Sequence, residues 1–367
     1  MLIDHYKNAG VNFLSTDIYV QDPRDETAEG FITEYYQQRE KGDAVFRFAF
    51  SRDIQPFSKA SHTMSAFLLG MHFKELVEER VCNLLSENTW RIKNDFEYPW
   101  FLCCLYHDVY SQYEKDHKNE ARASFAETKL HMEIDHDIYT EEMDILENRG
   151  LPLSYAERTV KEYYQQRFRN GKKKYGNGTA DHGILSGYYC YDRLVKNYLR
   201  HRKAYGKGHD HFEEPNKNGQ RLAWDKDQIW VFGLAADAII AHNIWHTPEY
   251  SNILQLCPGG PRERKLSIEE TPLAYFLSLI DTIEPIKWFA SVQKDGEKHS
   301  EWDVLRHIDM KMQNGIISIT QDYDVFNFEK WFIGKDMENI QTWLKNTTAR
   351  LSPNKKKITI ELPTADE

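Results

Sequence analysis

Residues 229–245 have the sequence IWVFGLAADAIIAHNIW, which is apolar around almost the whole circumference of a helix. Because a surface helix is apolar along one stripe only, this segment predicts a helix at the centre of the molecule. Residues 271–285, TPLAYFLSLIDTIEP, have the same character, and Pro272 and Pro285 lie near the expected start and just beyond the expected end. Two such segments predict a mainly α fold.

Further helices are expected earlier in the chain. Apolar residues spaced close to 3.6 predict one or two amphipathic helices in residues 61–87 and another helix in residues 179–199. Residues 98–113, YPWFLCCLYHDVYSQY, predict a buried helix with Pro99 in its first turn. A polar, histidine-bearing loop is expected at residues 201–220.

The pattern changes divide the chain into three parts. Residues 1–55 mix short apolar pieces with acidic patches and are expected to form a peripheral lead-in. Residues 56–291 carry the helical pattern, with a polar insert at about 114–178. Residues 292–367 are expected to form a small C-terminal α+β module.

Short β-branched or alternating segments support the strand predictions. In the C-terminal module they occupy residues 307–312, 315–320 and 356–362, and residues 329–351 have helical spacing. The module is therefore expected to follow the order strand, strand, helix, strand. In the lead-in, VFRFAF at residues 45–50 places phenylalanine at alternate positions and suits a short strand or an extended segment that lies on the core.

The composition is that of an ordinary globular protein. Of 367 residues, 41% are apolar, which excludes a disordered chain. Asp and Glu number 57 and Lys and Arg 47, and the resulting net charge of −10 disfavours general nucleic-acid binding because it repels a phosphate backbone. The five cysteines form no CxxC pair, and we recognise neither a signal peptide nor a membrane span. A reducing, cytoplasmic location without membrane association is expected.

Histidine and aspartate interrupt or open the apolar helices at five places. An ionised carboxylate in a core is costly unless it is paired or bound to a metal, so these positions mark a candidate site. Imidazole nitrogens and carboxylate oxygens together suit first-row transition metals. The residues are His62, His107, Asp108, His182, His242 and Asp281.

This set is large enough for two metal ions. A carboxylate bridges two ions where a neutral imidazole cannot, so sharing Asp108 supplies four ligands to one ion and three to the other. The remaining open positions would hold a bridging water. We expect two divalent transition-metal ions, Fe, Mn, Zn, Ni or Co, with Mg as a further option.

The ordered set resembles the HD-domain superfamily of metal-dependent phosphohydrolases, in the form with two extra histidines that binds a dinuclear centre. The local contexts are also similar, because an apolar segment precedes His107-Asp108, DHG surrounds His182, AIIAHN contains His242 and LIDTIEP contains Asp281. The resemblance covers about residues 58–285. It implies an HD-type helical bundle core.

The His-Asp dipeptide occurs three times in the chain. His107-Asp108 is preferred because an apolar segment leads into it, whereas His136-Asp137 and His209-Asp210 lie in polar segments typical of a solvated surface. His72 competes with His62 for the first position. The resemblance favours His62, because the first histidine of the family opens its helix.

Four other features have two interpretations each. His246 follows His242 by one turn and could line the same pocket, and Asp237 suits a helix end or an arginine better than a metal. The run Lys172, Lys173, Lys174 suits a substrate phosphate or a solvated loop. The last feature is an aromatic group that suits a stacked base or the core, comprising Tyr188, Tyr189 and Tyr191.

The resemblance implies a hydrolase of small phosphate esters, either nucleotides or cyclic and other phosphodiesters, that uses a hydroxide bridging the metals. We assign catalytic roles to Asp108, His182 and His242. The general acid, the choice between monoester and diester, and the oligomeric state are left open by the sequence. The same holds for the roles of the insert and the C-terminal module.

Three other functions suit the same residues. A single-strand nuclease would use the lysine loop and the tyrosines as a groove, and a di-iron oxygenase would use the same ligand set. A non-catalytic scaffold is favoured if His182 and His242 lie too far apart to share an ion.

Overall fold

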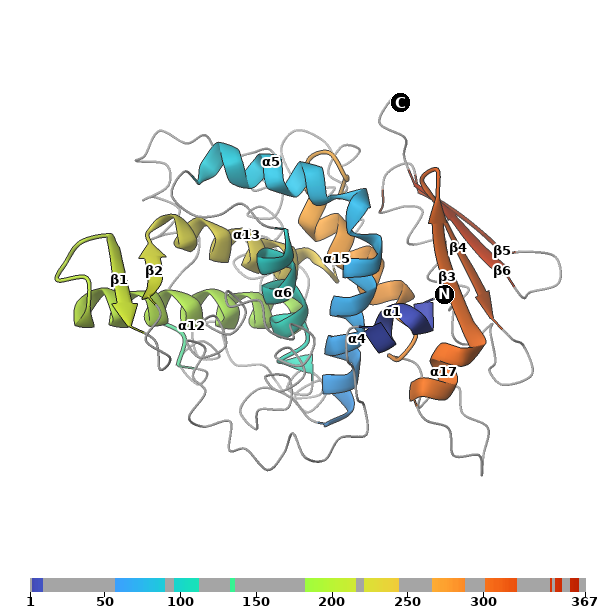
Figure 1. The fold of residues 1–367 in the computed structure, drawn as a ribbon, viewed down its shortest axis with the longest axis horizontal. Coiled ribbons are helices and arrows are strands. Elements are labelled where there is room, and N and C mark those ends of the chain that lie inside the picture. Colours follow the sequence, from blue (N-terminus) through green and yellow to red (C-terminus); the bar gives the residue numbers. More distant parts are fainter. Residues whose placement is uncertain are drawn as a thin grey trace, which may run out of the picture.

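The computed structural model describes residues 2–8, 57–89, 96–111, 133–135, 182–215, 221–243, 266–287, 301–321, 344, 347–351 and 357–362. Within these residues the protein is mostly helical, with a small sheet module near the C-terminus, as the sequence predicts. Most of the helices gather in one body, and the four-stranded sheet lies to one side of it (Figure 1). No described helix combines the length and apolar character that a membrane span requires.

The helical body is built around α13 (Asp227–Ala241). Every residue of this helix except Leu234 is buried, which confirms the prediction of a central helix. It packs against four other helices, which are α5 (Glu78–Asn88), α6 (Glu97–Tyr106), α12 (His182–Ala204) and α15 (Pro272–Ile283). A further helix, α4 (Phe57–Phe73), packs against α6 and α15, and the 3-10 turn Lys74–Leu76 separates it from α5.

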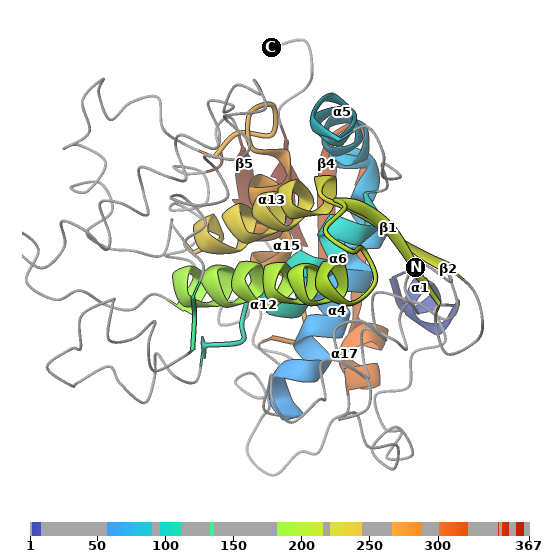
Figure 2. The ribbon, with the colours of Figure 1, turned by 90° about the vertical axis from the view of Figure 1, so that its left-hand side faces the viewer.

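The helices α12 and α13 lie side by side with closely approaching backbones (Figure 2). A Cβ atom added at Gly187 of α12 would lie 2.6 Å from Cγ1 of Ile240 and 2.8 Å from the carbonyl oxygen of Ala236, both on α13. Only glycine leaves room for this approach. The close contact sets the spacing between residues at the start of α12 and those at the end of α13.

Replacing Gly187 with alanine is expected to lower the free energy of unfolding by about 1–3 kcal/mol, because the added methyl group overlaps backbone atoms. The matched control is Gly233→Ala on α13, where the new Cβ would meet only the Tyr191 ring at 3.8 Å. There the higher helix propensity of alanine should raise the free energy of unfolding by up to about 1 kcal/mol. Urea denaturation of both variants measures the difference, and effects of the same sign would contradict this account of the contact.

The C-terminal module is an antiparallel sheet with the order β3-β4-β6-β5. Its first two strands, β3 (Ile308–Gln313) and β4 (Ile316–Gln321), are joined by Asn314 and Gly315, whose φ angles of 51° and 72° suit a two-residue hairpin turn. The isoleucines at alternate positions of β4 and β6 (Lys357–Glu361) face the core and are paired across the strands. The alternation of buried and exposed side chains therefore agrees with the strands predicted for these residues.

The N-terminal helix α1 (Leu2–Asn8) packs against α4, against the short helix α17 (Glu301–His307) and against β3. In Figure 1 it lies between the helical body and the sheet. Leu2 and Tyr6 are fully buried. The sequence predicts a peripheral lead-in over residues 1–55, and of the seven residues of that region that the structure describes, Leu2, Ile3 and Tyr6 belong to the hydrophobic core.

Two segments differ from their sequence predictions. The expected loop at residues 201–220 contains β1 (His211–Pro215), which pairs with β2 (Arg221–Asp225), and Phe212 stacks on Trp224 across the hairpin. The last residues of the helix predicted at 329–351 form β5 (Thr348–Leu351), because pairing with β6 satisfies their backbone. Both outcomes depend on partners that a local pattern does not contain.

Several predictions fall outside the described residues. These are the strand at 45–50, nearly all of the insert at 114–178 and most of the helix at 329–351.

Candidate metal centre

All six residues singled out in the sequence lie together at one place in the helical body. They form two groups, and within each group the candidate ligand atoms lie within 4.8 Å of one another. The first group is His62, His107 and Asp281, and the second is Asp108, His182 and His242. The helices α4 and α15 supply the first and last residues of the order, and His107 and Asp108 directly follow α6. His182 begins α12 and His242 follows α13.

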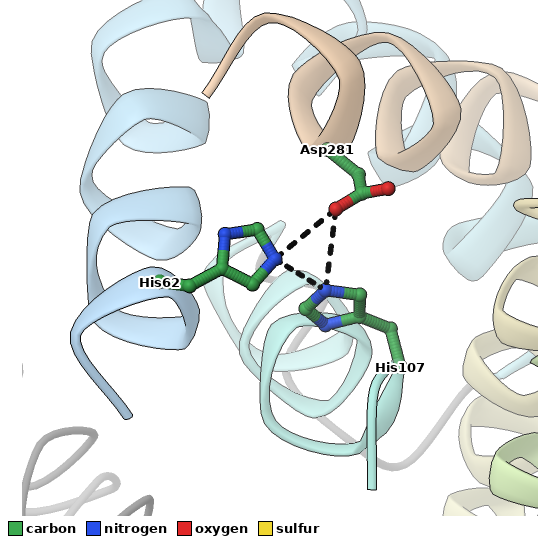
Figure 3. Close-up of side chains that lie close together, drawn as sticks. All are labelled: His62, His107 and Asp281. Carbon is green, nitrogen blue, oxygen red and sulfur yellow. Dashed lines mark hydrogen bonds and ion pairs between the residues drawn. The ribbon is translucent and has the colours of Figure 1, made fainter. Parts of the chain in front are cut away.

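The first group is a compact triangle of buried side chains (Figure 3). Nε2 of His62 lies 3.0 Å from Nε2 of His107 and 3.1 Å from Oδ1 of Asp281, and Nε2 of His107 lies 3.5 Å from the same oxygen. Three donor atoms that converge in this way, two of them imidazole nitrogens, form a suitable ligand set for a transition-metal ion.

Asp108 lies between the two groups. Its Oδ1 is 3.2 Å from Nε2 of His182, while its Oδ2 is 3.6 Å from Nε2 of His62 and 3.8 Å from Nε2 of His107. The carboxylate therefore turns one oxygen toward each group. This is the arrangement that a carboxylate shared by two cations requires.

Hydrogen bonds at Nδ1 orient three of the four imidazole rings. Nδ1 of His107 donates to the carbonyl oxygen of Cys104 at 2.8 Å, and Nδ1 of His242 donates to that of Ile239 at 2.6 Å. Nδ1 of His62 donates to Glu284 at 2.7 Å. A neutral ring that carries its proton on Nδ1 presents a lone pair on Nε2, so these contacts prepare Nε2 as the ligand atom.

One fully buried polar atom of the cluster, Nε2 of His242, has no hydrogen-bond partner, and Oδ1 of Asp281 faces the ring nitrogens of His62 and His107. Buried polar atoms are normally satisfied, and a missing partner at a cluster of donor atoms fits a cation. Burial lowers the pKa of His242 to about 3, with the nearby His107 and His182 adding to the effect against the opposing Asp281. His242 is therefore neutral at pH 7, as a metal ligand must be.

Asp281 is ionised despite its burial. Burial raises its pKa, but the Lys287 ammonium and the adjacent His107 and His62 rings outweigh that effect and hold the pKa well below its usual value. Nζ of Lys287 lies 2.6 Å from Oδ2 of Asp281. One carboxylate oxygen is thus held by a cation of the chain, and Oδ1 remains for the centre.

Sequence reasoning missed Glu284, Lys287 and Asn243. Nδ2 of Asn243 donates to Nε2 of His182 at 2.6 Å, at the same nitrogen that faces Oδ1 of Asp108, so an ion bound by His182 at Nε2 would take the place of this contact. Glu284 lies three residues after Asp281 in an apolar helix end, so the cost of burying a carboxylate could have marked it in the same way. Lys287 and Asn243 had no comparable signal.

The competing residues that the structure describes lie away from the two ligand groups. His72 packs beside His5, with ring centroids 5.1 Å apart, and its Nε2 donates to the carbonyl oxygen of Met310 in the sheet. The dipeptide His209-Asp210 is exposed. Asp237 is buried but belongs to neither ligand group. The dipeptide His136-Asp137, His246 and the lysine run at 172–174 lie outside the described residues.

The centre combines four imidazoles and two carboxylates within the helical body, a donor set that could bind metal ions. Among these side chains His182 is the most accessible, with 21% of its side chain exposed, and the others are nearly fully buried. Comparison with known protein families, curated proteins and solved structures found no match for this chain.

Proposed function

We propose that this chain is a metal-dependent hydrolase of phosphate esters with an HD-type helical bundle core and a dinuclear centre. The observation that supports it best is the position of Asp108. Its Oδ1 faces His182 of the second group, and its Oδ2 faces His62 and His107 of the first group. The order of the ligands along the chain resembles that of the dinuclear HD superfamily.

His62, His107 and Asp281 would hold one ion, His182 and His242 the other, and Asp108 both. When bound, two such ions lower the pKa of a water held between them and neutralise charge on the phosphoryl oxygens. Lys287 and the three Nδ1 hydrogen bonds keep the ligands oriented. Because five of the six ligands are almost fully buried, bulk water has access mainly at His182.

The surface next to His182 suits a phosphate ester whose alcohol part carries an aromatic base. On α12, His182, Tyr189 and Arg193 lie on one face at positions i, i+7 and i+11, and this is the face that is not buried. The Arg193 guanidinium lies over the Tyr189 ring at 6.0 Å, and Tyr110, two residues after Asp108, meets that ring edge-on at 5.4 Å. These side chains would bind the base of a nucleotide by stacking.

The neighbouring tyrosines on this helix separate into two roles. Tyr188 and Tyr191 are buried and fill the core, which leaves Tyr189 as the partly exposed member of the three.

The scaffold hypothesis required His182 and His242 to lie too far apart to share an ion, and their ring centroids are 5.5 Å apart. Metal content, oxygen consumption and oligonucleotide cleavage separate the di-iron oxygenase and the nuclease from our proposal.

Element analysis of the purified protein, followed by a panel of phosphate esters, tests the proposal. We expect two transition-metal ions per chain and faster hydrolysis of nucleoside phosphates than of glycerol phosphate. Replacing Tyr189 with alanine should raise the KM for the nucleoside phosphates about tenfold, since loss of base stacking costs about 1–3 kcal/mol, and leave glycerol phosphate unaffected. Tyr205→Ala, at an exposed tyrosine beyond the end of α12, is the matched control.

Three results would contradict the proposal. A protein that contains iron alone and consumes oxygen without hydrolysing any ester would be an oxygenase. Preferential, salt-sensitive binding and cleavage of oligonucleotides would indicate a nuclease. Equal loss of activity on all esters in the Tyr189 variant would remove the argument for a nucleotide.

A further inference from the structure

Glu284 is a completely buried carboxylate whose oxygens are all engaged. The backbone amide of Ile286 donates to Oε1 and that of Lys287 to Oε2, each at 2.7 Å. The hydroxyl of Ser65 donates to Oε1, and Nδ1 of His62 donates to Oε2. The carboxylate therefore connects the end of α15 to two side chains of α4, which lie three residues apart on one helix face.

Ser65 in turn is hydrogen-bonded to the N-terminal helix. The hydroxyl of Tyr6 lies 2.9 Å from the carbonyl oxygen of Ser65 and 2.8 Å from its Oγ. Tyr6 is fully buried, and the two residues are 59 positions apart in the chain. Since Ser65 donates its own proton to Glu284, the single hydroxyl proton of Tyr6 is shared between the carbonyl oxygen and Oγ of Ser65.

These contacts form one continuous chain from Tyr6 through Ser65 and Glu284 to His62. The last contact decides the orientation of the metal centre, because a carboxylate at Nδ1 keeps the proton there and directs Nε2 of His62 toward His107 and Asp281. In contrast, Nδ1 of His107 and Nδ1 of His242 donate to backbone carbonyls within their own helix ends. Among these three ligands, His62 is therefore the one whose Nδ1 contact comes from a distant part of the chain.

We propose that Tyr6, Ser65 and Glu284 are positioning residues for the ion held by His62, His107 and Asp281, and that the N-terminal helix α1 is by this route a component of the metal centre. The proposal rests on the dinuclear centre of the proposed function and is independent of the substrate. Because coupling between two equilibria is reciprocal, binding of that ion strengthens the docking of α1 on α4.

Titration of the metal-free full-length protein with Co²⁺, followed by calorimetry and by the visible absorption of the bound ion, tests the proposal. We expect two binding events in the wild type. Glu284→Gln should weaken one of them about 10- to 100-fold, the usual effect of losing a carboxylate behind a ligating histidine. Tyr6→Phe and Ser65→Ala should weaken the same event by a smaller factor, and none of the three should change the other event.

Two matched controls separate positioning from general destabilisation. Tyr275→Phe removes another buried tyrosine hydroxyl, which contacts Thr347 away from the centre, and should leave both Co²⁺ affinities unchanged. His182→Ala removes a candidate ligand of the second group and should weaken the event that the other variants spare. Hydrogen exchange gives a second measurement, in which Co²⁺ should slow exchange of the α1 amides in the wild type and have less effect in the Ser65 variant.

The possible results distinguish this proposal from the proposed function. If both Co²⁺ affinities of Tyr6→Phe and Glu284→Gln stay within about twofold of the wild type, well short of the expected loss, the positioning chain is wrong and the dinuclear centre stands. Equal weakening of both Co²⁺ binding events, in these variants and in Tyr275→Phe alike, would also overturn the proposed positioning role. If the wild type binds no Co²⁺, both proposals fail. Should Glu284→Gln not fold, the nearly isosteric Tyr6→Phe variant decides the question.

Discussion

Replacing Asp108 with alanine is expected to remove both metal ions and to lower kcat/KM for phosphate esters by at least about 1000-fold. The carboxylate lies within 4 Å of Nε2 of His62, His107 and His182, so neither group keeps its full set of ligands without it. The ions supply several kcal/mol of transition-state stabilisation, and each 1.36 kcal/mol corresponds to a factor of ten in rate. Element analysis and steady-state kinetics on the same preparation measure both effects.

The chain offers a matched control for this variant. His209-Asp210 is the same dipeptide on an exposed turn, where Asp210 pairs with Arg202 at 2.9 Å. Alanine at both positions should change neither the metal content nor the kinetics. An Asp108→Ala protein that lost its metal and still hydrolysed esters at the wild-type rate would refute the mechanism.

Chelation of the metal ions is expected to lower the melting temperature of the wild type by roughly 5–10 °C. Removal of the ions leaves Nε2 of His242 buried without a hydrogen bond. Two sites that are each saturated at 100 times the Kd stabilise the folded state by about 5 kcal/mol together, and a change of this size shifts the melting temperature of a large domain by several degrees. Differential scanning calorimetry with and without EDTA measures the shift.

The Asp108→Ala protein is the control for chelation, because it has lost its ions already and should melt at one temperature in both buffers. Restoring Mn²⁺, Co²⁺ or Zn²⁺ to the chelated wild type should recover the original transition. A wild type whose melting temperature and ester hydrolysis both resist EDTA would rule out a structural and catalytic role for the ions.

The local sequence patterns predict most of the helical body, because the apolar surface of each helix must be buried whichever helix it packs against. A segment that is apolar on all sides, such as residues 229–245, has to lie in the interior whatever its neighbours are, and α13 does. The same reasoning marked the candidate ligands. Asp281 and His242 stand out because a polar group in such a segment needs a partner of its own.

The strands show where local patterns fail. The predicted strands at β3, β4 and β6 have alternating or β-branched sequences, and the structure confirms them. The strand β5 was predicted as the end of a helix, since its residues form a strand only by pairing with β6. An edge strand of four residues carries too few side chains to produce a pattern of its own.

From the amino-acid sequence one can derive which helices are central and which histidines and aspartates need partners, because both follow from the cost of exposing apolar groups and of burying charged ones. How those residues are held depends on contacts between distant segments. Asp108 faces two ligand groups only once the helices that carry them have packed together. Tyr6 reaches Ser65, and Ser65 reaches Glu284, across 59 and 219 residues, so these contacts exist only in the folded chain. A hydrogen bond of that kind leaves no periodicity in the sequence, because its energy depends on a distance that tertiary packing alone determines.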